Sequence, residues 1–104
     1  MLTEPTRDEV DQIMGPVVLE FGASWCPHCE AIQSTMAELR SRYTTIRHIP
    51  VEDGRGRRLG RSFRVKLWPT LIFLRDGRVI HELVRPSATE MARGFEMLHS
   101  GGHE

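Results

Sequence analysis

The chain has 104 residues, of which 14 are basic and 14 acidic, so its formal net charge is zero. This length suffices for one domain and is too short for two, so we expect residues 1–104 to form a single domain. The balanced charge gives no indication of a nucleic-acid or membrane partner. Two cysteines cannot form a disulfide scaffold, so the fold must depend on its hydrophobic core.

The amino-terminal segment Met1–Pro5 has neither a basic region nor an apolar run. We therefore expect no signal peptide and no membrane span, and the expected location is the cytoplasm. A chain from which a signal peptide had been removed would look the same, and such a protein would be periplasmic.

The first half of the chain has the pattern of a helix, a strand, a longer helix and a second strand. Thr6–Glu9 has the spacing of a capping box, and Gly15-Pro16 ends the short helix that it begins. Val17–Phe21 is apolar on both faces, as in the middle of a covered sheet. The remaining pattern predicts a helix over about Pro27–Tyr43 and a strand, parallel to the first, over Thr44–Val51.

The second half has the pattern of a short helix, a β-hairpin and a final helix. Asp76-Gly77 is a hairpin turn signal, and Ser87–Glu90 is a second capping box. The predicted elements are a turn over Glu52–Gly56, a helix over Arg57–Arg64, strands over Thr70–Leu74 and Arg78–Val84, and a helix ended by Gly101-Gly102. The predicted order is α-β-α-β-α-β-β-α, which is an α/β fold.

The only two cysteines, Cys26 and Cys29, are separated by two residues and lie between a predicted strand and a predicted helix. This context is typical of a dithiol that cycles with a disulfide. Cys26 should lie at the start of the helix, where unpaired N–H groups favour the attacking thiolate. Cys29, one turn further and facing inward, would resolve the mixed disulfide.

The sequence alone leaves other roles open for the cysteine pair. One alternative is a pair of buried structural cysteines, and another is a zinc site, which needs about four ligands. None of the histidines has paired metal-ligand spacing; they are His28, His48, His81, His99 and His103. A c-type haem would need a histidine directly after Cys29, where Glu30 stands. We expect no metal and no cofactor.

The order of elements, with Trp25–Cys29 after the first strand and Trp68–Thr70 opening the third, resembles the thioredoxin family over residues 6–100. The resemblance implies the thioredoxin fold, a central mixed four-stranded sheet flanked by helices. It also implies a cis peptide bond before Pro69, beside the cysteines. Pro27-His28 between the cysteines resembles the strongly oxidising, periplasmic DsbA-type proteins.

The chain departs from ordinary thioredoxins at three places. Residues 1–5 leave little room for the extra strand with which those proteins begin. Ser34 stands where a proline commonly kinks the active-site helix, and Gly22 stands where a second tryptophan is common. Two of these departures flank the cysteines.

Glu20 alternates with Val18 in an apolar strand, so its side chain should point into a covered face. A buried carboxylate without a partner has a raised pKa, as functional sites often do. The resemblance places an acidic residue six positions before the first cysteine and beneath the second, where it accepts the proton that Cys29 loses. The alternative is a glutamate at the sheet edge that reaches solvent.

His28 can donate to the Cys26 thiolate or attract it as an imidazolium, which would make the disulfide a stronger oxidant. The alternative is an exposed, solvated histidine.

Substrate binding is assigned to Trp25, Pro27, Trp68 and Pro69. Pro69 would present the backbone of Trp68 to a substrate peptide, while Trp25 and Trp68 would frame an apolar patch around Cys26. Either ring could instead belong to the core, and Trp25 is expected at the surface.

A basic stretch follows the second predicted strand: Arg55, Arg57, Arg58, Arg61 and Arg64. We expect a solvated helix face; contact with an acidic partner or a phosphate is the alternative.

The predicted function is that of a thiol–disulfide oxidoreductase that acts on protein disulfides through a Cys26/Cys29 cycle, as a monomer. In a cytoplasm, thioredoxin reductase or glutathione would recharge it as a reductase, and an oxidising compartment would reverse the net direction. The alternatives are a non-enzymatic redox sensor or thiol-dependent binding module and, more remotely, a metal carrier.

Overall fold

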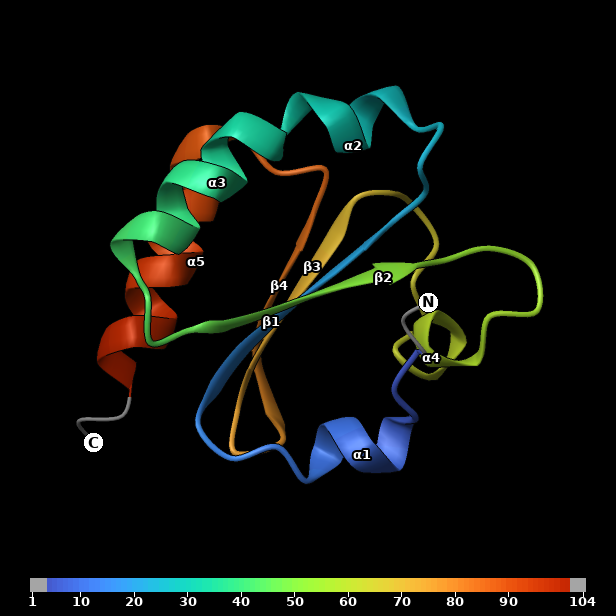
Figure 1. The fold of residues 1–104 in the computed structure, drawn as a ribbon, viewed down its shortest axis with the longest axis horizontal. Coiled ribbons are helices and arrows are strands. Elements are labelled where there is room, and N and C mark those ends of the chain that lie inside the picture. The colour runs from blue at the N-terminus through green and yellow to red at the C-terminus, as the bar shows by residue number, and fades with distance from the viewer. Residues whose placement is uncertain (1–3, 102–104) are drawn as a thin grey trace.

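A four-stranded β-sheet lies at the centre of the computed structural model, which describes residues 4–101 (Figure 1). The strands are β1 (Pro16–Gly22), β2 (Arg47–Glu52), β3 (Thr70–Arg75) and β4 (Arg78–Val84), in the spatial order β2-β1-β3-β4. β1 and β2 are parallel, whereas β3 is antiparallel to both β1 and β4. The predicted mixed sheet is therefore confirmed, with the apolar strand β1 in its interior.

Helices cover both faces of this sheet (Figure 1). They are α1 (Arg7–Asp11), α2 (Pro27–Ala31), α3 (Gln33–Arg42), α4 (Arg58–Ser62) and α5 (Ala88–Ser100). α3 and α5 pack with Val18 in one buried cluster, whereas α1 and α4 pack with Val17 in another. Because side chains alternate along a strand, Glu20 lies on the same face as Val18, under α3 and α5.

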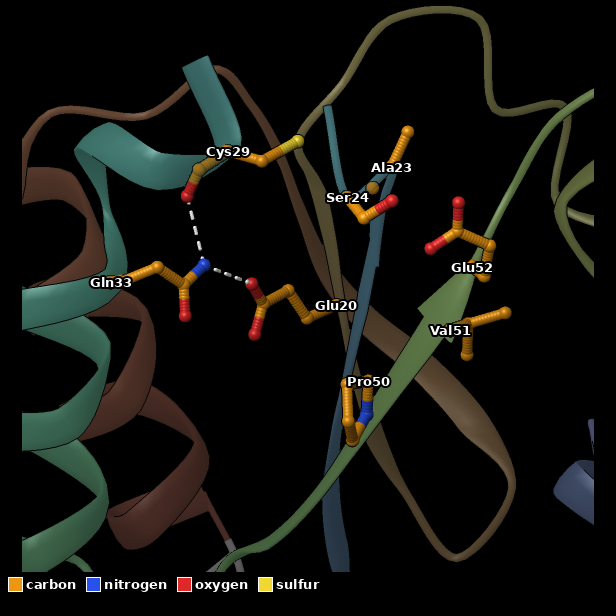
Figure 2. Close-up of a pocket in the computed structure, with 9 residues that line it drawn as sticks. Glu20, Ala23, Ser24, Cys29, Gln33, Pro50, Val51 and Glu52 are labelled. Carbon is orange, nitrogen blue, oxygen red and sulfur yellow. Dashed lines mark hydrogen bonds between the residues drawn. The ribbon is translucent and has the colours of Figure 1, made fainter. Parts of the chain in front are cut away.

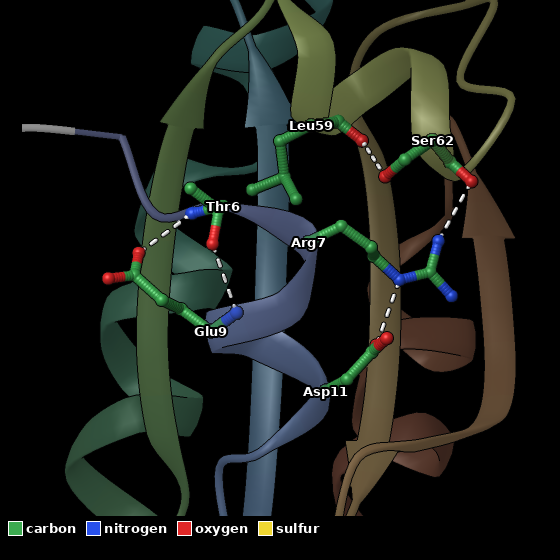
Figure 3. Close-up of polar contacts among 6 residues, drawn as sticks. All are labelled: Thr6, Arg7, Glu9, Asp11, Leu59 and Ser62. Carbon is green, nitrogen blue, oxygen red and sulfur yellow. Dashed lines mark hydrogen bonds and ion pairs between the residues drawn. The ribbon is translucent and has the colours of Figure 1, made fainter.

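Capping boxes begin α1 and α5, as the sequence predicts. Thr6 Oγ1 accepts a hydrogen bond from the Glu9 backbone N–H at 3.1 Å, and Glu9 Oε1 accepts from the Thr6 N–H at 2.8 Å (Figure 3). Ser87 and Glu90 make the same two bonds at the start of α5. Each box satisfies two N–H groups that a helix start leaves without partners.

Arg7 connects α1 to α4. Its Nε bonds to Asp11 Oδ1 at 2.9 Å, and its Nη1 donates to the Ser62 carbonyl at 2.8 Å (Figure 3). The guanidinium also lies 3.8 Å from the centre of the Phe63 ring. These contacts fix the end of α4 against α1. The helix α4 is shorter than the predicted Arg57–Arg64.

The single helix predicted over Pro27–Tyr43 is wrong, because the chain breaks at Ile32 (φ −98°, ψ −1°) into α2 and α3. At the break, the side-chain amide of Gln33 donates to the Cys29 carbonyl at 2.8 Å (Figure 2). Regular hydrogen bonding resumes from the Met36 N–H to the Ile32 carbonyl at 2.9 Å. The break therefore forms without a proline, in a chain that has Ser34 at this point.

The second strand begins later than predicted, at Arg47 instead of Thr44. The Ile46 N–H donates to the Tyr43 carbonyl at 3.1 Å, so the β-branched residues 44–46, at the start of the predicted strand, form a turn. The predicted hairpin turn is confirmed, with Asp76 (φ 53°) and Gly77 (φ 80°) both in the left-handed region. This pattern suits the twist of antiparallel strands.

Candidate active site

The two cysteines lie where β1 ends and α2 begins, beside the loop that leads into β3. Both are free thiols, and both are almost fully buried, with 4% of Cys26 and 7% of Cys29 exposed. They form a small apolar cluster with Ala23, against which Trp68 packs. The Trp68–Pro69 peptide bond is cis, as the family resemblance implies.

Cys26 is the N-cap residue of α2, and Pro27 follows at the first helical position. The Cys26 Sγ accepts a hydrogen bond from the Cys29 backbone N–H at 3.2 Å. A backbone N–H directed at sulfur favours the negatively charged thiolate over the thiol. The predicted position of Cys26 at the start of the helix is confirmed by its place as the N-cap. The residue is almost fully buried.

Cys29 lies behind Cys26, against β1. A Cβ atom added at Gly22 would lie 2.8 Å from Cys29 Sγ, so only a residue without a side chain fits there unless the sulfur moves. Burial above all, and then the Cys26 sulfur and the Glu20 carboxylate, raise the pKa of Cys29 to about 11. At neutral pH Cys29 is therefore a thiol, and it must lose a proton before it can attack.

Glu20 is buried on the α3/α5 face, so the alternative of a solvent-reaching glutamate is excluded. Its Oε1 lies 2.6 Å from His48 Nε2, and its Oε2 accepts from Gln33 Nε2 at 2.7 Å (Figure 2 shows the latter bond). Burial alone would raise the pKa of Glu20, but the hydrogen bonds from His48 and Gln33 outweigh it and hold the pKa below its ordinary value. The predicted unpartnered carboxylate with a raised pKa is therefore wrong, and Glu20 is a carboxylate at neutral pH.

Gln33 links the carboxylate to the cysteine motif. Its single amide nitrogen donates both to Glu20 and, at 2.8 Å, to the carbonyl of Cys29 (Figure 2). Two acceptors on different elements thus share one NH₂ group, which has two protons to give. One side chain therefore contacts both the break between α2 and α3 and the Glu20 carboxylate.

A pocket of about 220 Å³ lies between α2 and β2 and reaches both Glu20 and Cys29 (Figure 2). Its lining residues are Glu20, Gly22, Ala23, Ser24, Cys29, Gln33, Pro50, Val51 and Glu52. At roughly 30 Å³ of liquid volume for each water molecule, such a space can hold a short water bridge. Glu20 and the inner cysteine, Cys29, thus line one pocket that has room for several water molecules.

Two tryptophans form the rim beside Cys26. Trp25 is 73% exposed, and its ring meets that of Trp68 edge to face, with centroids 5.5 Å apart. Trp68 is half-buried, and its indole N–H donates to Asp53 Oδ2 at 2.8 Å. The expected surface position of Trp25 is confirmed, and Trp68 contributes both to the rim and to the packing beneath it.

The chain is similar to proteins of known family along most of its length. A family model described as thioredoxin matches residues 3–95. A solved structure of thioredoxin 2 from Pseudomonas aeruginosa PAO1, in its reduced form, is 54% identical with a TM-score of 0.83, over 95% of this chain and 93% of that one. The chain belongs to the thioredoxin family. Its fold is the thioredoxin fold, and it is a thiol–disulfide oxidoreductase that acts on protein disulfides.

Curated relatives in the thioredoxin family are more distant. Thioredoxin H5 from Arabidopsis thaliana is 28% identical over 82% of this chain and 71% of its own length. Thioredoxin Asp f 28 from Aspergillus fumigatus is 31% identical over 67% of this chain and 65% of its own length. The matched region therefore spans about two thirds of these relatives.

Three residues at this thioredoxin site were not found by sequence reasoning: Gln33, His48 and Arg85. The sequence suggests His48 only as a possible metal ligand, yet it lies on β2 two residues before Pro50, the partner of Glu20 in the parallel register. Alternation along β2 places both on one face, which is the signal that could have found it. Gln33 follows Cys29 by one helical turn, and Arg85 contacts the Trp68 carbonyl.

His28 is exposed, and no hydrogen bond connects it to Cys26 within residues 4–101. Of the other histidines weighed as ligands, His81 packs on Phe73 and His99 on Tyr43, while His103 lies outside the described residues. Across residues 4–101, no three His, Cys, Asp or Glu side chains are grouped so as to hold a metal ion.

The five arginines of the basic stretch, between Arg55 and Arg64, are all exposed. No helix within residues 4–101 combines the length and the apolar character that a membrane span requires.

Proposed function

We propose that this thioredoxin-family protein exchanges electrons with protein disulfides through Cys26 and Cys29, as one domain over residues 1–104. The Cys26 thiolate attacks one sulfur of the substrate disulfide, the substrate S–S bond breaks, and one substrate thiolate leaves. The Cys29 thiolate then attacks Cys26 Sγ and releases the second substrate thiolate. Two electrons pass from the dithiol to the substrate, and the reverse sequence forms a substrate disulfide.

This assignment rests on the different environments of the two cysteine sulfur atoms. Cys26 Sγ receives the Cys29 N–H at 3.2 Å, whereas burial raises the pKa of Cys29 to about 11. The first setting suits an attacking thiolate and the second a thiol that is activated only when needed.

Glu20 is proposed to accept the proton from Cys29. Because its pKa is held below the ordinary value, Glu20 is ionised at neutral pH and has a free oxygen site for a proton, although the same lowered pKa makes it a weaker base. The proton would pass through water in the pocket that the two residues share. His48 and Gln33 hold the carboxylate in place, and we assign them positioning roles.

Substrate peptides are proposed to lie against Trp25, Pro27, Trp68 and Pro69. The exposed Trp25 ring supplies apolar surface beside Cys26, and the Trp68 carbonyl lies 4.0 Å from Cys26 Sγ. A short extended contact along Trp68 would align the substrate disulfide with the sulfur. We propose that the protein works as a monomer in the cytoplasm and that thioredoxin reductase or glutathione restores the dithiol.

Catalysed insulin reduction tests this function. We expect the native chain, at micromolar concentration with dithiothreitol, to accelerate insulin precipitation strongly over dithiothreitol alone. A redox sensor or binding module would instead give negligible turnover while still binding one partner, and such a result would contradict the proposal. Heat-denatured protein at the same concentration is the matched control.

Pro27-His28 supports a more oxidising potential than that of thioredoxin, as in DsbA-type proteins. We expect His28→Gln to make the Cys26/Cys29 reduction potential more negative by about 5–20 mV, because an exposed charge interaction contributes roughly 0.2–1 kcal/mol and 30 mV corresponds to about 1.4 kcal/mol. Equilibration with glutathione measures it, between about −270 mV for thioredoxin and about −120 mV for DsbA. An unchanged potential would mean that His28 is simply solvated.

A further inference from the structure

Arg85 lies between β4 and α5 in a conformation that ordinarily favours glycine. Its φ is 49°, in the left-handed region, where a side chain is disfavoured. Its backbone N–H donates to the Pro69 carbonyl at 2.9 Å, and its side-chain Nε donates to the Trp68 carbonyl at 2.9 Å. An arginine in this conformation is therefore bound along the Trp68–Pro69 peptide, on the rim of the active site.

The Trp68 carbonyl connects Arg85 to the reacting sulfur. The same oxygen lies 4.0 Å from Cys26 Sγ. Arg85 is exposed and uses only Nε in this bond, so neither NH₂ group of its guanidinium is bonded within residues 4–101. Within residues 4–101, Arg85 forms no ion pair with a carboxylate.

The charges around the rim favour an acidic partner. Asp53, an acidic residue beside Trp68, already accepts from the indole N–H of Trp68, and its carboxylate lies over Gly60 of α4. Lys66, two residues before Trp68, is exposed and adds a second positive charge. A substrate segment lying along Trp68 thus meets a cation whose two NH₂ groups are not occupied by the protein itself.

We propose that Arg85 selects protein disulfides in which an aspartate or glutamate lies next to the attacked cysteine. The guanidinium NH₂ groups bind the substrate carboxylate in the planar geometry that arginine favours, while Nε stays on the Trp68 carbonyl. Charge complementarity of this kind gives specificity more than affinity. The inference rests on the proposed Cys26 attack and adds a preferred class of substrate.

The test uses three synthetic peptide disulfides that differ only in the residue beside the cysteine: glutamate, glutamine or lysine. Each oxidises the pre-reduced native chain in a single turnover, followed by tryptophan fluorescence and by mass spectrometry. We expect the glutamate peptide to react about fivefold faster than the lysine peptide at low salt, in the range of an exposed charge pair. The preference should shrink in 0.5 M NaCl because salt screens exposed charges.

Arg85→Gln and Arg85→Gly should both abolish the preference, and the glycine variant also relieves the left-handed backbone. Arg78→Gln is the matched control: it removes an exposed arginine next to the β3–β4 turn, at the other end of the sheet (Figure 1), and should keep the preference. Equal slowing of all three peptides by Arg85→Gln would overturn the inference in favour of a loop-supporting role. If the native chain reacts with all three peptides at equal rates, the Arg85 inference is overturned and the Cys26 attack stands. If it reacts with none of them, both the inference and the proposed Cys26 attack are overturned.

Discussion

Cys26→Ser is expected to abolish catalysed insulin reduction, whereas Cys29→Ser should stop the cycle after its first chemical step. A serine hydroxyl is not ionised at neutral pH and cannot replace the thiolate that the Cys29 N–H stabilises. We expect turnover of Cys26→Ser to fall by 10³-fold or more, on the order seen when other enzymes lose their nucleophile. Cys29→Ser should lose turnover as completely but retain attack by Cys26.

The two variants differ in what accumulates. Cys29→Ser should collect a mixed disulfide between Cys26 and the substrate, visible as an added mass that dithiothreitol removes. Cys26→Ser should collect little, because Cys29 is buried and its pKa is raised to about 11. Since both positions are buried, thermal unfolding must first show that each variant is folded. Adduct formation on Cys29 at the native rate would reverse the proposed roles.

The sequence was sufficient for most of the fold, because local signals decide it. Both capping boxes, at Thr6 and at Ser87, are formed as their spacing predicts. Asp76-Gly77 makes the hairpin turn because both residues adopt positive φ. The predicted burial of Glu20 follows from its alternation with Val18 in β1. Each of these depends on residues close together in the chain or on one strand.

The spacing of apolar residues did not predict the structure where polar groups from separate elements meet. The apolar spacing of Ile32, Met36 and Leu39 continues across the break at Ile32, since it reports which side chains are buried and not which carbonyl receives a bond. At the break the Gln33 amide bonds to the Cys29 carbonyl, and the hydrogen bonds from His48 and Gln33 lower the pKa of Glu20. Contacts of this kind require knowledge of register and distance that spacing does not contain.

Arg85 was missed for a different reason. Nothing in its sequence context indicates that the residue adopts a left-handed conformation, because glycine and asparagine are the usual signals. Only the folded chain brings it against the Trp68 carbonyl, 17 residues earlier.

Glu20→Gln is expected to slow the second chemical step, the attack of Cys29 on Cys26, by about 10²-fold at pH 7. Glutamine keeps the shape of Glu20 and can still bond to its neighbours, but it cannot take the Cys29 proton. Since the Glu20 charge is one of the causes that raise the pKa of Cys29, its removal lowers that pKa and offsets a part of the loss. The mixed disulfide with a peptide, quenched by acid and measured by mass spectrometry, should therefore live longer in the variant.

The pH dependence separates a lost base from a disturbed pocket. Without Glu20, resolution needs the small fraction of Cys29 already ionised, so the rate should rise about tenfold for each pH unit as long as the pH is below the pKa of Cys29. The native rate should depend less steeply on pH near neutrality, because the pKa of Glu20 is lowered and the carboxylate is already ionised there. Glu52→Gln removes an exposed carboxylate from the same pocket and should leave the native profile unchanged. Parallel profiles for the native chain and Glu20→Gln would show that the proton leaves Cys29 by another route.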